Sequence, residues 1–161
     1  MALKIPLVLT SGQIQQLQAG DSLNASCNEI DVVEMTNSNA GAVVICSPVY
    51  VDGAGTFDKA QADASATTEI LGLVAEPTSI GIAGSGSIQT DGILTATTGE
   101  WDAVTGDVGG LTAGSVYYVD PDTAGMLTTT APSAAGDFVI RVGVALSTLD
   151  LDITVTPPIK L

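Results

Sequence analysis

The sequence predicts an all-β protein: a β-sandwich or barrel-like domain with an extended N-terminal arm and at most one or two short helices. Of the 161 residues, 45% are hydrophobic but only 4% are aromatic, and 18 are glycines. Runs of β-branched residues recur between Gly, Asn, Asp and Pro, which is the pattern of short strands joined by tight turns. A chain of this length buries about 70% of the surface that it exposes when unfolded, so a substantial core is expected.

Composition divides the chain into an arm of residues 1–28, a β-rich domain of residues 29–156 and a tail of residues 157–161. The arm starts with a short apolar run around Pro6, which suits an extended edge strand. Further along the arm, two apolar residues lie three positions apart among glutamines, and this spacing fits one helical turn or a docking loop. Such an arm has little to pack on by itself, whereas in an assembly it can lie across a neighbouring subunit.

The first half of the domain contains several strand-like runs. Residues 30–35 and 42–51 are expected to pair as a hairpin, because Asn and Gly in the turn between them favour positive φ. Residues 58–64 contain helix-forming residues and predict one internal helix. Residues 70–74 predict another strand, and residues 87–97 predict a strand that is kinked at an Asp-Gly pair.

The last third of the chain has the clearest strand pattern. Residues 115–119 and 126–130 flank a connector of Asp, Pro and Gly, which predicts a β-hairpin. After a second turn, residues 138–146 and 149–155 are rich in β-branched residues. They predict two further strands.

Five stretches of the arm and the last third form a set of motifs. They read Leu-Gln-x-Gly-Asp-x-Leu from Leu17, Gly-Leu-Thr-x-Gly-x-x-Tyr-Tyr-x-Asp from Gly110, Leu-Thr-Thr-Thr-x-Pro from Leu127, Val-Gly-x-Ala-Leu-Ser from Val142, and Pro-Pro-Ile from Pro157. Together they resemble a β-rich module of tailed-bacteriophage virion proteins, which occurs in head decoration proteins, head fibres and tail fibres. Residues 29–99 add no motif to this resemblance.

The resemblance implies a non-enzymatic structural protein on the capsid surface of a phage virion, made in the cytoplasm of the bacterial host. It favours a head decoration, or cement, protein that binds the major capsid protein and further copies of itself, commonly as a trimer. The base of a head fibre or tail fibre is an alternative. The apolar residues of the arm are the candidates for contact with a capsid or a neighbouring subunit: Leu3, Ile5, Leu7, Val8, Leu9, Ile14 and Leu17.

The charge of the chain excludes several classes of partner. Eighteen acidic residues stand against four basic ones, which gives a formal net charge of −14. Such a surface repels phosphate backbones and anionic lipid headgroups, so neither nucleic acid nor a membrane is an expected partner. The apolar run of the arm is too interrupted for a signal peptide, and no run approaches the roughly 18 apolar residues of a membrane span.

No set of residues predicts a catalytic centre or a cofactor. The sequence has no His, and the spacing of Cys27 and Cys46 is not that of a metal site, so two reduced thiols are expected. A catalytic triad lacks its base. The carboxylate pairs that begin at Glu100 and at Asp120 are expected in turns, where Asp side chains cap backbone groups.

Calcium is the metal that the acidic turns suit best. Asp120, Asp122 and Thr123 supply hard oxygen atoms over a short span, and Asp102 and Asp107 can add more. The spacing lacks the regular ladder and the terminal Glu of an EF-hand. Turn formation is therefore the expected role of these residues, with calcium binding as the alternative.

Aromatic and basic residues give three more expectations. Trp101 is expected in the core or an interface, although a carbohydrate-binding module that stacks sugars on Trp101 and a tyrosine is an alternative function. Neighbouring residues of a strand point to opposite faces, so one of Tyr117 and Tyr118 is expected in the core and the other at solvent or a neighbour. Arg141 lies in an apolar strand, and an ion pair with an Asp is expected there.

Overall fold

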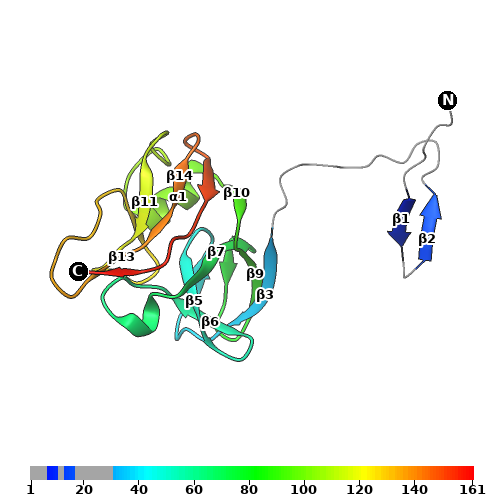
Figure 1. Cartoon of the computed structure of the whole chain (residues 1–161), viewed down its shortest axis with the longest axis horizontal. Coiled ribbons are helices and arrows are strands. Elements are labelled where there is room, and N and C mark those ends of the chain that lie inside the picture. Colours follow the sequence, from blue (N-terminus) through cyan, green and yellow to red (C-terminus); the bar gives the residue numbers. More distant parts are fainter. Residues whose placement is uncertain (1–6, 11–12, 17–30) are drawn as a thin grey trace.

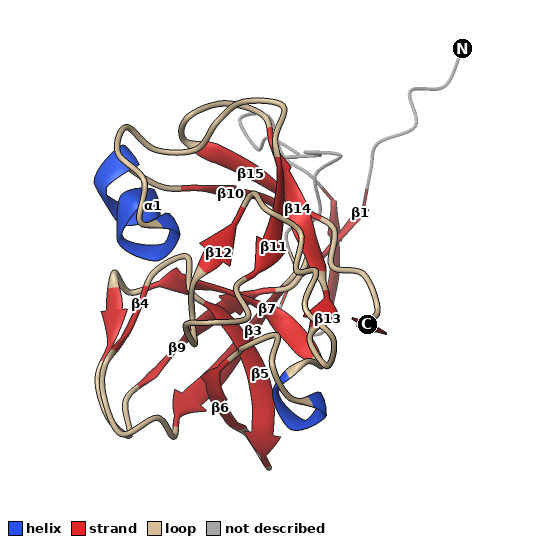
Figure 2. Ribbon diagram, turned by 90° about the vertical axis from the view of Figure 1, so that its left-hand side faces the viewer, coloured by secondary structure: helices blue, strands red, loops and turns tan. Residues whose placement is uncertain are grey.

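The computed structural model describes residues 7–10, 13–16 and 31–161, and its fold is all-β as the sequence predicts (Figure 1). A closed five-stranded barrel and a five-stranded antiparallel sheet contain most of the strand residues within residues 31–161. Figure 2 shows the sheet stacked on the barrel, with a helix beside one end of the sheet. Barrel-like architecture and a small helical content are both confirmed.

The barrel strands are connected in the order β3-β6-β5-β7-β9. These strands are β3 (Val32–Asn37), β5 (Pro48–Gly53), β6 (Thr56–Lys59), β7 (Ile70–Glu76) and β9 (Ser85–Gln89). Strand β3 pairs in parallel with β6 and antiparallel with β9, which closes the barrel. Its core contains Met35, Val43, Val49, Phe57, Val74, Ile80 and Ile88.

The five-stranded sheet has the order β10-β15-β14-β11-β12. Its strands are β10 (Gly92–Thr95), β11 (Val116–Val119), β12 (Leu127–Thr128), β14 (Arg141–Ala145) and β15 (Asp150–Ile153). A second and larger core joins this sheet to the barrel, because barrel residues such as Leu73 and Ala60 pack in one cluster with Tyr117, Val142 and Leu151. The two sheets therefore stabilise each other.

The α-helix of the described residues is α1 (Thr98–Thr105), and the sequence patterns above do not predict it. Thr97 and Glu100 form a capping box, in which the Thr97 hydroxyl accepts a hydrogen bond from the Glu100 backbone N–H and the Glu100 carboxylate accepts one from the Thr97 N–H. Gly106 ends the helix with a φ of 72°. The capping-box spacing is visible in the sequence and was the signal for this helix.

Replacing Thr97 with Ala is expected to destabilise the protein by about 1 kcal/mol, because the N-cap hydroxyl is lost and a backbone N–H at the start of α1 loses its partner. Urea denaturation followed by circular dichroism measures this change. Thr97→Ser keeps the hydroxyl and is the matched control. Equal destabilisation by both replacements would contradict the capping role.

The helix expected over residues 58–64 is absent from the structure. Thr56–Lys59 is strand β6, and Ser65–Thr67 forms a single 3-10 turn, η1. Between these two elements, Ala60 and Ala62 are both fully buried, and the chain enters a turn at Ala62. Pairing of β6 with β3 and β5 outweighs the modest helix propensity of these residues.

The hairpin expected between residues 30–35 and 42–51 is also wrong. The first run becomes β3, but its antiparallel partner is β9, about fifty residues further along. Cys46 has a φ of 68° and divides the second run into β4 (Val43–Val44) and β5. Strand β4 pairs with β8 (Ser79–Ile80), and β5 pairs with β6 and β7.

The other strand predictions are confirmed in position, but the single strands predicted over residues 87–97 and 138–146 are each divided between two sheets. The last-third hairpin is β11 and β12, in which Tyr118 lies opposite Thr128. The kink predicted in residues 87–97 lies where the chain leaves β9 and enters β10, and Gly92 has a φ of 80° there. Residues 138–146 form β13 (Phe138–Val139) and β14, and residues 149–155 contain β15.

The chain ends are extended. Residues of the predicted tail form β16 (Ile159–Lys160), which pairs with β13. In the arm, β1 (Leu7–Thr10) lies in the predicted extended run and pairs antiparallel with β2 (Gln13–Gln16), with Leu9 opposite Ile14. Where one helical turn or a docking loop was expected around Ile14, the structure therefore has a strand, because pairing with β1 satisfies its backbone groups.

Candidate interaction surfaces

The motif that starts at Gly110 builds the β11–β12 hairpin and the loop before it. Leu111 is buried, and the Tyr117 hydroxyl accepts a hydrogen bond of 2.9 Å from the Thr112 backbone N–H. Just after β11, Asp120 Oδ1 accepts hydrogen bonds from the backbone N–H groups of Asp122 and Thr123, at 2.7 and 2.8 Å. Leu111, Tyr117 and Asp120 of this motif thus have structural roles in the loop and the hairpin.

Trp101 lies in the large core with 0% exposure, and its Nε1–H donates a hydrogen bond of 2.8 Å to the Leu149 carbonyl. The core interpretation is confirmed. Sugar stacking on Trp101 is therefore wrong as an expectation, because the ring has no free face in this fold. Tyr117 is buried and Tyr118 is half-buried on the opposite face, as the strand alternation predicts.

Arg141 does not form the ion pair that the sequence led us to expect. Within residues 31–161 no carboxylate pairs with it, and its buried Nε atom has no hydrogen-bond partner. Strand β14 places Arg141 opposite Tyr118 on β11, and its backbone N–H donates to the Thr156 hydroxyl. The register of the sheet therefore places Tyr118, and not a carboxylate, opposite Arg141 on β11.

The carboxylates singled out in the sequence are occupied by backbone groups. Glu100 and Asp102 lie on α1 and not in a turn. Asp102 accepts hydrogen bonds from the N–H groups of Gly109 and Gly110, at 3.2 and 2.6 Å. Hydrogen bonds from the Thr97 backbone and hydroxyl lower the pKa of Glu100. Across the described ranges, no three His, Cys, Asp or Glu side chains gather in a way that could hold a metal ion.

Calcium is expected to leave the melting temperature unchanged, because Asp120 is already engaged in its own turn and a metal that bound only the native state would raise the melting temperature. Differential scanning fluorimetry with calcium and with a chelator measures this. The matched variants are Asp122→Ala, which should be nearly neutral, and Asp120→Ala, which should cost about 1 kcal/mol through the lost turn bonds. A chelator-sensitive melting temperature that Asp122→Ala abolishes would contradict this expectation.

Cys46 is buried and forms no disulfide within the described residues. Burial first, and the nearby Glu100 charge second, strongly raise the pKa of its thiol. The thiol therefore stays protonated at neutral pH and is a poor nucleophile. Cys27 lies outside the described residues, so the expectation for that thiol is open.

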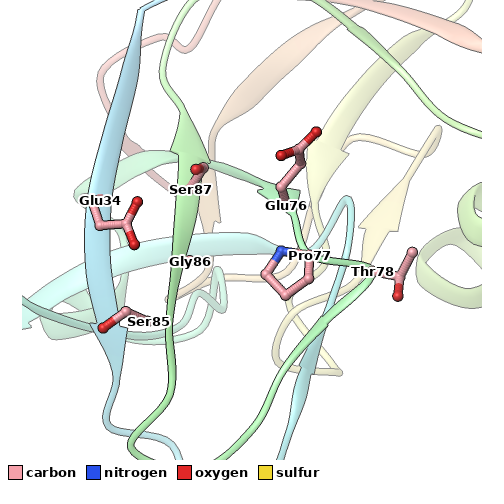
Figure 3. A pocket seen from close by; sticks show the side chains of 7 residues that line it. All are labelled: Glu34, Glu76, Pro77, Thr78, Ser85, Gly86 and Ser87. Atoms are coloured by element: carbon pink, nitrogen blue, oxygen red, sulfur yellow. The ribbon is translucent and has the colours of Figure 1, made fainter.

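A long groove runs over the outer face of β3, β9 and β7. One half has a volume of about 550 Å³, and Figure 3 shows Glu34 and Glu76 on either side of Ser87 in it. The other half, of about 420 Å³, is lined by Val32, Ala75, Glu76, Ser87, Gln89, Ile93, Leu94 and Thr95. Glu76 and Ser87 line both halves, so the two adjoin. The half in Figure 3 carries two carboxylates, whereas the other half mixes apolar residues with Glu76 and uncharged polar side chains.

Sequence reasoning missed this groove. Its walls come from β3 and from β7 and β9, which are about forty to fifty residues further along the chain and become neighbours only when the barrel closes. No alternation in β3 marked the groove, because Val32, Val33 and Glu34 are consecutive and all exposed before the buried Met35.

The candidate contact residues of the arm are only partly within the structure. Leu7, Val8 and Leu9 belong to β1, and Ile14 belongs to β2. The remaining three candidates, Leu3, Ile5 and Leu17, lie outside the described residues. The assignment of an interaction role to this set stays a prediction.

Among the described residues, no helix is long and apolar enough to cross a membrane. No protein family and no curated protein matches the sequence. Among solved structures, a chain from the capsid of Myoviridae phage XM1 is similar to this one, with 20% identity over 89% of this chain and 93% of that chain. The TM-score is 0.44. At that identity and TM-score the likeness assigns no family to the chain.

Proposed function

We propose that this chain is a non-enzymatic structural protein of a tailed-bacteriophage virion, and within the virion a decoration protein that binds the outer capsid surface and stabilises the head. The resemblance of the arm and the last third to virion modules suggests the class. The observation that carries the proposal is the arrangement of the arm. Strands β1 and β2 form a two-stranded sheet of their own, without a ladder to the barrel or to the larger sheet.

A two-stranded hairpin is at best marginally stable alone in water. Ordering its backbone costs roughly 1–2 kcal/mol per residue, whereas full burial of an apolar side chain contributes on the order of 1.5–3 kcal/mol. Burial of Leu7, Val8 and Leu9 therefore offsets the entropy cost of ordering the arm only if a partner surface covers these side chains. Addition of the arm to an exposed strand edge of a capsid or neighbouring subunit supplies both cover and main-chain hydrogen bonds.

The remaining features of the chain fit a binding role better than a catalytic one. The reactive-looking groups have structural tasks: Asp102 and Asp120 hold loops, Glu100 caps a helix, and Cys46 is buried. The net charge of −14 keeps copies dispersed at the high local concentration of a particle surface. It also complements a basic partner surface.

Binding to capsids that lack the protein tests this function. The purified chain is mixed with such capsids, and the fraction that co-sediments is measured as a function of its concentration. Saturable binding and a higher temperature of capsid disruption are expected. Absence of binding, or binding without any effect on capsid stability, would contradict the decoration role. Catalytic turnover of a virion component by the purified chain would contradict the non-enzymatic assignment.

We expect the chain to be a homotrimer, because short arms and the open edges of β10, β12 and β16 are easily completed by symmetric neighbours. Light scattering at micromolar concentration gives the mass of the free protein, and the copy number at each site of the decorated capsid gives the bound state. A monomer in both states would contradict this prediction. A dimer would keep the proposed function but change its symmetry.

A further inference from the structure

Two loops at one end of the five-stranded sheet expose apolar side chains to solvent. Val108, in the loop after α1, is 96% exposed, and Leu146 and Leu149, in the β14–β15 turn, are 53% and 39% exposed. Figure 1 shows the two loops side by side beyond the ends of β11 and β14. We call Val108, Leu146 and Leu149 the loop patch. Exposed apolar side chains that gather in one place often mark a binding surface.

The two loops are joined by backbone contacts. The Leu111 N–H donates a hydrogen bond of 3.0 Å to the Thr148 carbonyl. A Cβ atom on Gly110 would lie 2.3 Å from that same carbonyl oxygen, so only glycine allows this approach. Trp101 adds a hydrogen bond from its Nε1–H to the Leu149 carbonyl. The three apolar residues therefore lie close along the chain to contacts that join the two loops.

Each loop is also held internally. The Asp102 carboxylate accepts hydrogen bonds from the N–H groups of Gly109 and Gly110, immediately after Val108. The Ser147 hydroxyl oxygen accepts from the N–H groups of Leu149 and Asp150, at 3.0 and 3.1 Å. Apolar side chains on such a constrained backbone lose little further backbone entropy on binding, and this favours affinity.

The charge around the loop patch is negative. Asp107 precedes Val108, Asp150 follows Leu149, and Asp102 lies beneath the first loop. Hydrogen bonds from Ser147 and Thr95 lower the pKa of Asp150, which keeps that carboxylate ionised.

The cations of residues 31–161 lie elsewhere. Lys59 packs against Gly125, Lys160 lies 5.9 Å from the centre of the Phe138 ring, and Arg141 is at the other end of β14 from Leu146. If two copies met through this patch in a two-fold contact, carboxylates would face carboxylates. Like charges at an interface suppress such a pairing.

We propose that the loop patch is a docking surface for a different protein, one that presents an apolar depression bordered by Lys or Arg side chains. The three apolar side chains enter the depression, and Asp107 and Asp150 face the basic border. This inference rests on the proposed function in one respect, since the partner is a component of the capsid surface. It adds to the arm a second and preformed point of attachment.

The test is a binding titration of the full chain and four variants on capsids that lack the protein. Val108→Asp and Leu146→Asp place a charge in the apolar contact, and each is expected to raise the Kd roughly tenfold or more. Val51→Asp is the matched control, because Val51 is 49% exposed on the barrel hairpin and distant in sequence from both loops. Its Kd should stay within about twofold of wild type. Asp107→Asn should weaken binding and reduce its dependence on salt.

The outcomes separate the two proposals. If wild type binds and both patch variants bind within about twofold of it, the docking inference fails and the proposed function stands. If wild type itself does not bind, the proposed function fails and the inference fails with it. Sedimentation of the free variants gives a further check: if Val108→Asp dissociates a homo-oligomer, a second copy occupies the patch and the inference is overturned.

Discussion

A chain that lacks residues 1–27 is expected to fold normally and to lose most of its attachment to capsids or its trimer contacts. The two cores consist of residues from Met35 onward, so the domain keeps its packing without the arm. The arm contributes the strand-forming run Leu7–Thr10, which needs a partner edge to become stable. Circular dichroism and thermal unfolding measure the fold, and co-sedimentation with undecorated capsids measures attachment.

The control for this deletion replaces two apolar arm residues in the full chain. Leu7→Asp with Leu9→Asp keeps the length of the arm but places charges where burial is predicted, so its binding should be as weak as that of the deletion. A truncated chain that saturates capsids with unchanged affinity would show that the arm is not the point of attachment. Unfolding of the truncated chain would show instead that the arm belongs to the domain.

Trp101→Ala is expected to destabilise the protein by about 3–5 kcal/mol, which is a large part of the stability of a domain of this size. The Trp101 indole, on α1, is fully buried in the larger core, and its loss leaves a cavity and removes one of the two hydrogen bonds that the Leu149 carbonyl accepts, the other being from the Ala96 N–H. Guanidinium denaturation followed by far-ultraviolet circular dichroism measures the change without depending on tryptophan fluorescence.

Trp101→Phe separates packing from hydrogen bonding. Phenylalanine retains much of the ring volume but cannot donate a hydrogen bond to the Leu149 carbonyl. We therefore expect a smaller loss in the free energy of unfolding, of which about 1 kcal/mol comes from the missing hydrogen bond. A change below 1 kcal/mol for Trp101→Ala would contradict the buried position. If Trp101→Ala remained fully stable and abolished binding to a glycan array, the carbohydrate-binding alternative would regain support.

Local sequence signals predicted those parts of the fold that depend on neighbours along the chain. The Asp, Pro and Gly connector between residues 115–119 and 126–130 gave the β11–β12 hairpin, because turn residues restrict the backbone within a few positions. The alternation of Tyr117 and Tyr118 gave one buried and one half-buried ring for the same reason. The Thr97–Glu100 capping box was equally local, but helix-poor residues around it hid the helix.

Signals that depend on distant pairing were not available in the sequence. Strand β3 has β9 as its antiparallel partner, and Ala60 and Ala62 are not helical but pack in the core between barrel and sheet. Differences in helix propensity amount to a few tenths of a kcal/mol per residue, whereas burial of an apolar side chain contributes several times more, so burial determines the conformation. Within residues 31–161 Arg141 has no acidic partner, and the register of the sheet sets Tyr118 opposite it.

The sequence by itself therefore determined the all-β class, the acidic surface, the local turns and the apolar arm, since each follows from composition or from residues close along the chain. The tertiary structure alone decided the closure of the barrel, the groove between β3, β9 and β7, and the loop patch. Each of these joins segments tens of residues apart, and the free energy that selects one such pairing comes from burial and backbone hydrogen bonding of the whole fold. The loop patch exists because Gly110 and Thr148 meet, and no pattern within either loop specifies that contact.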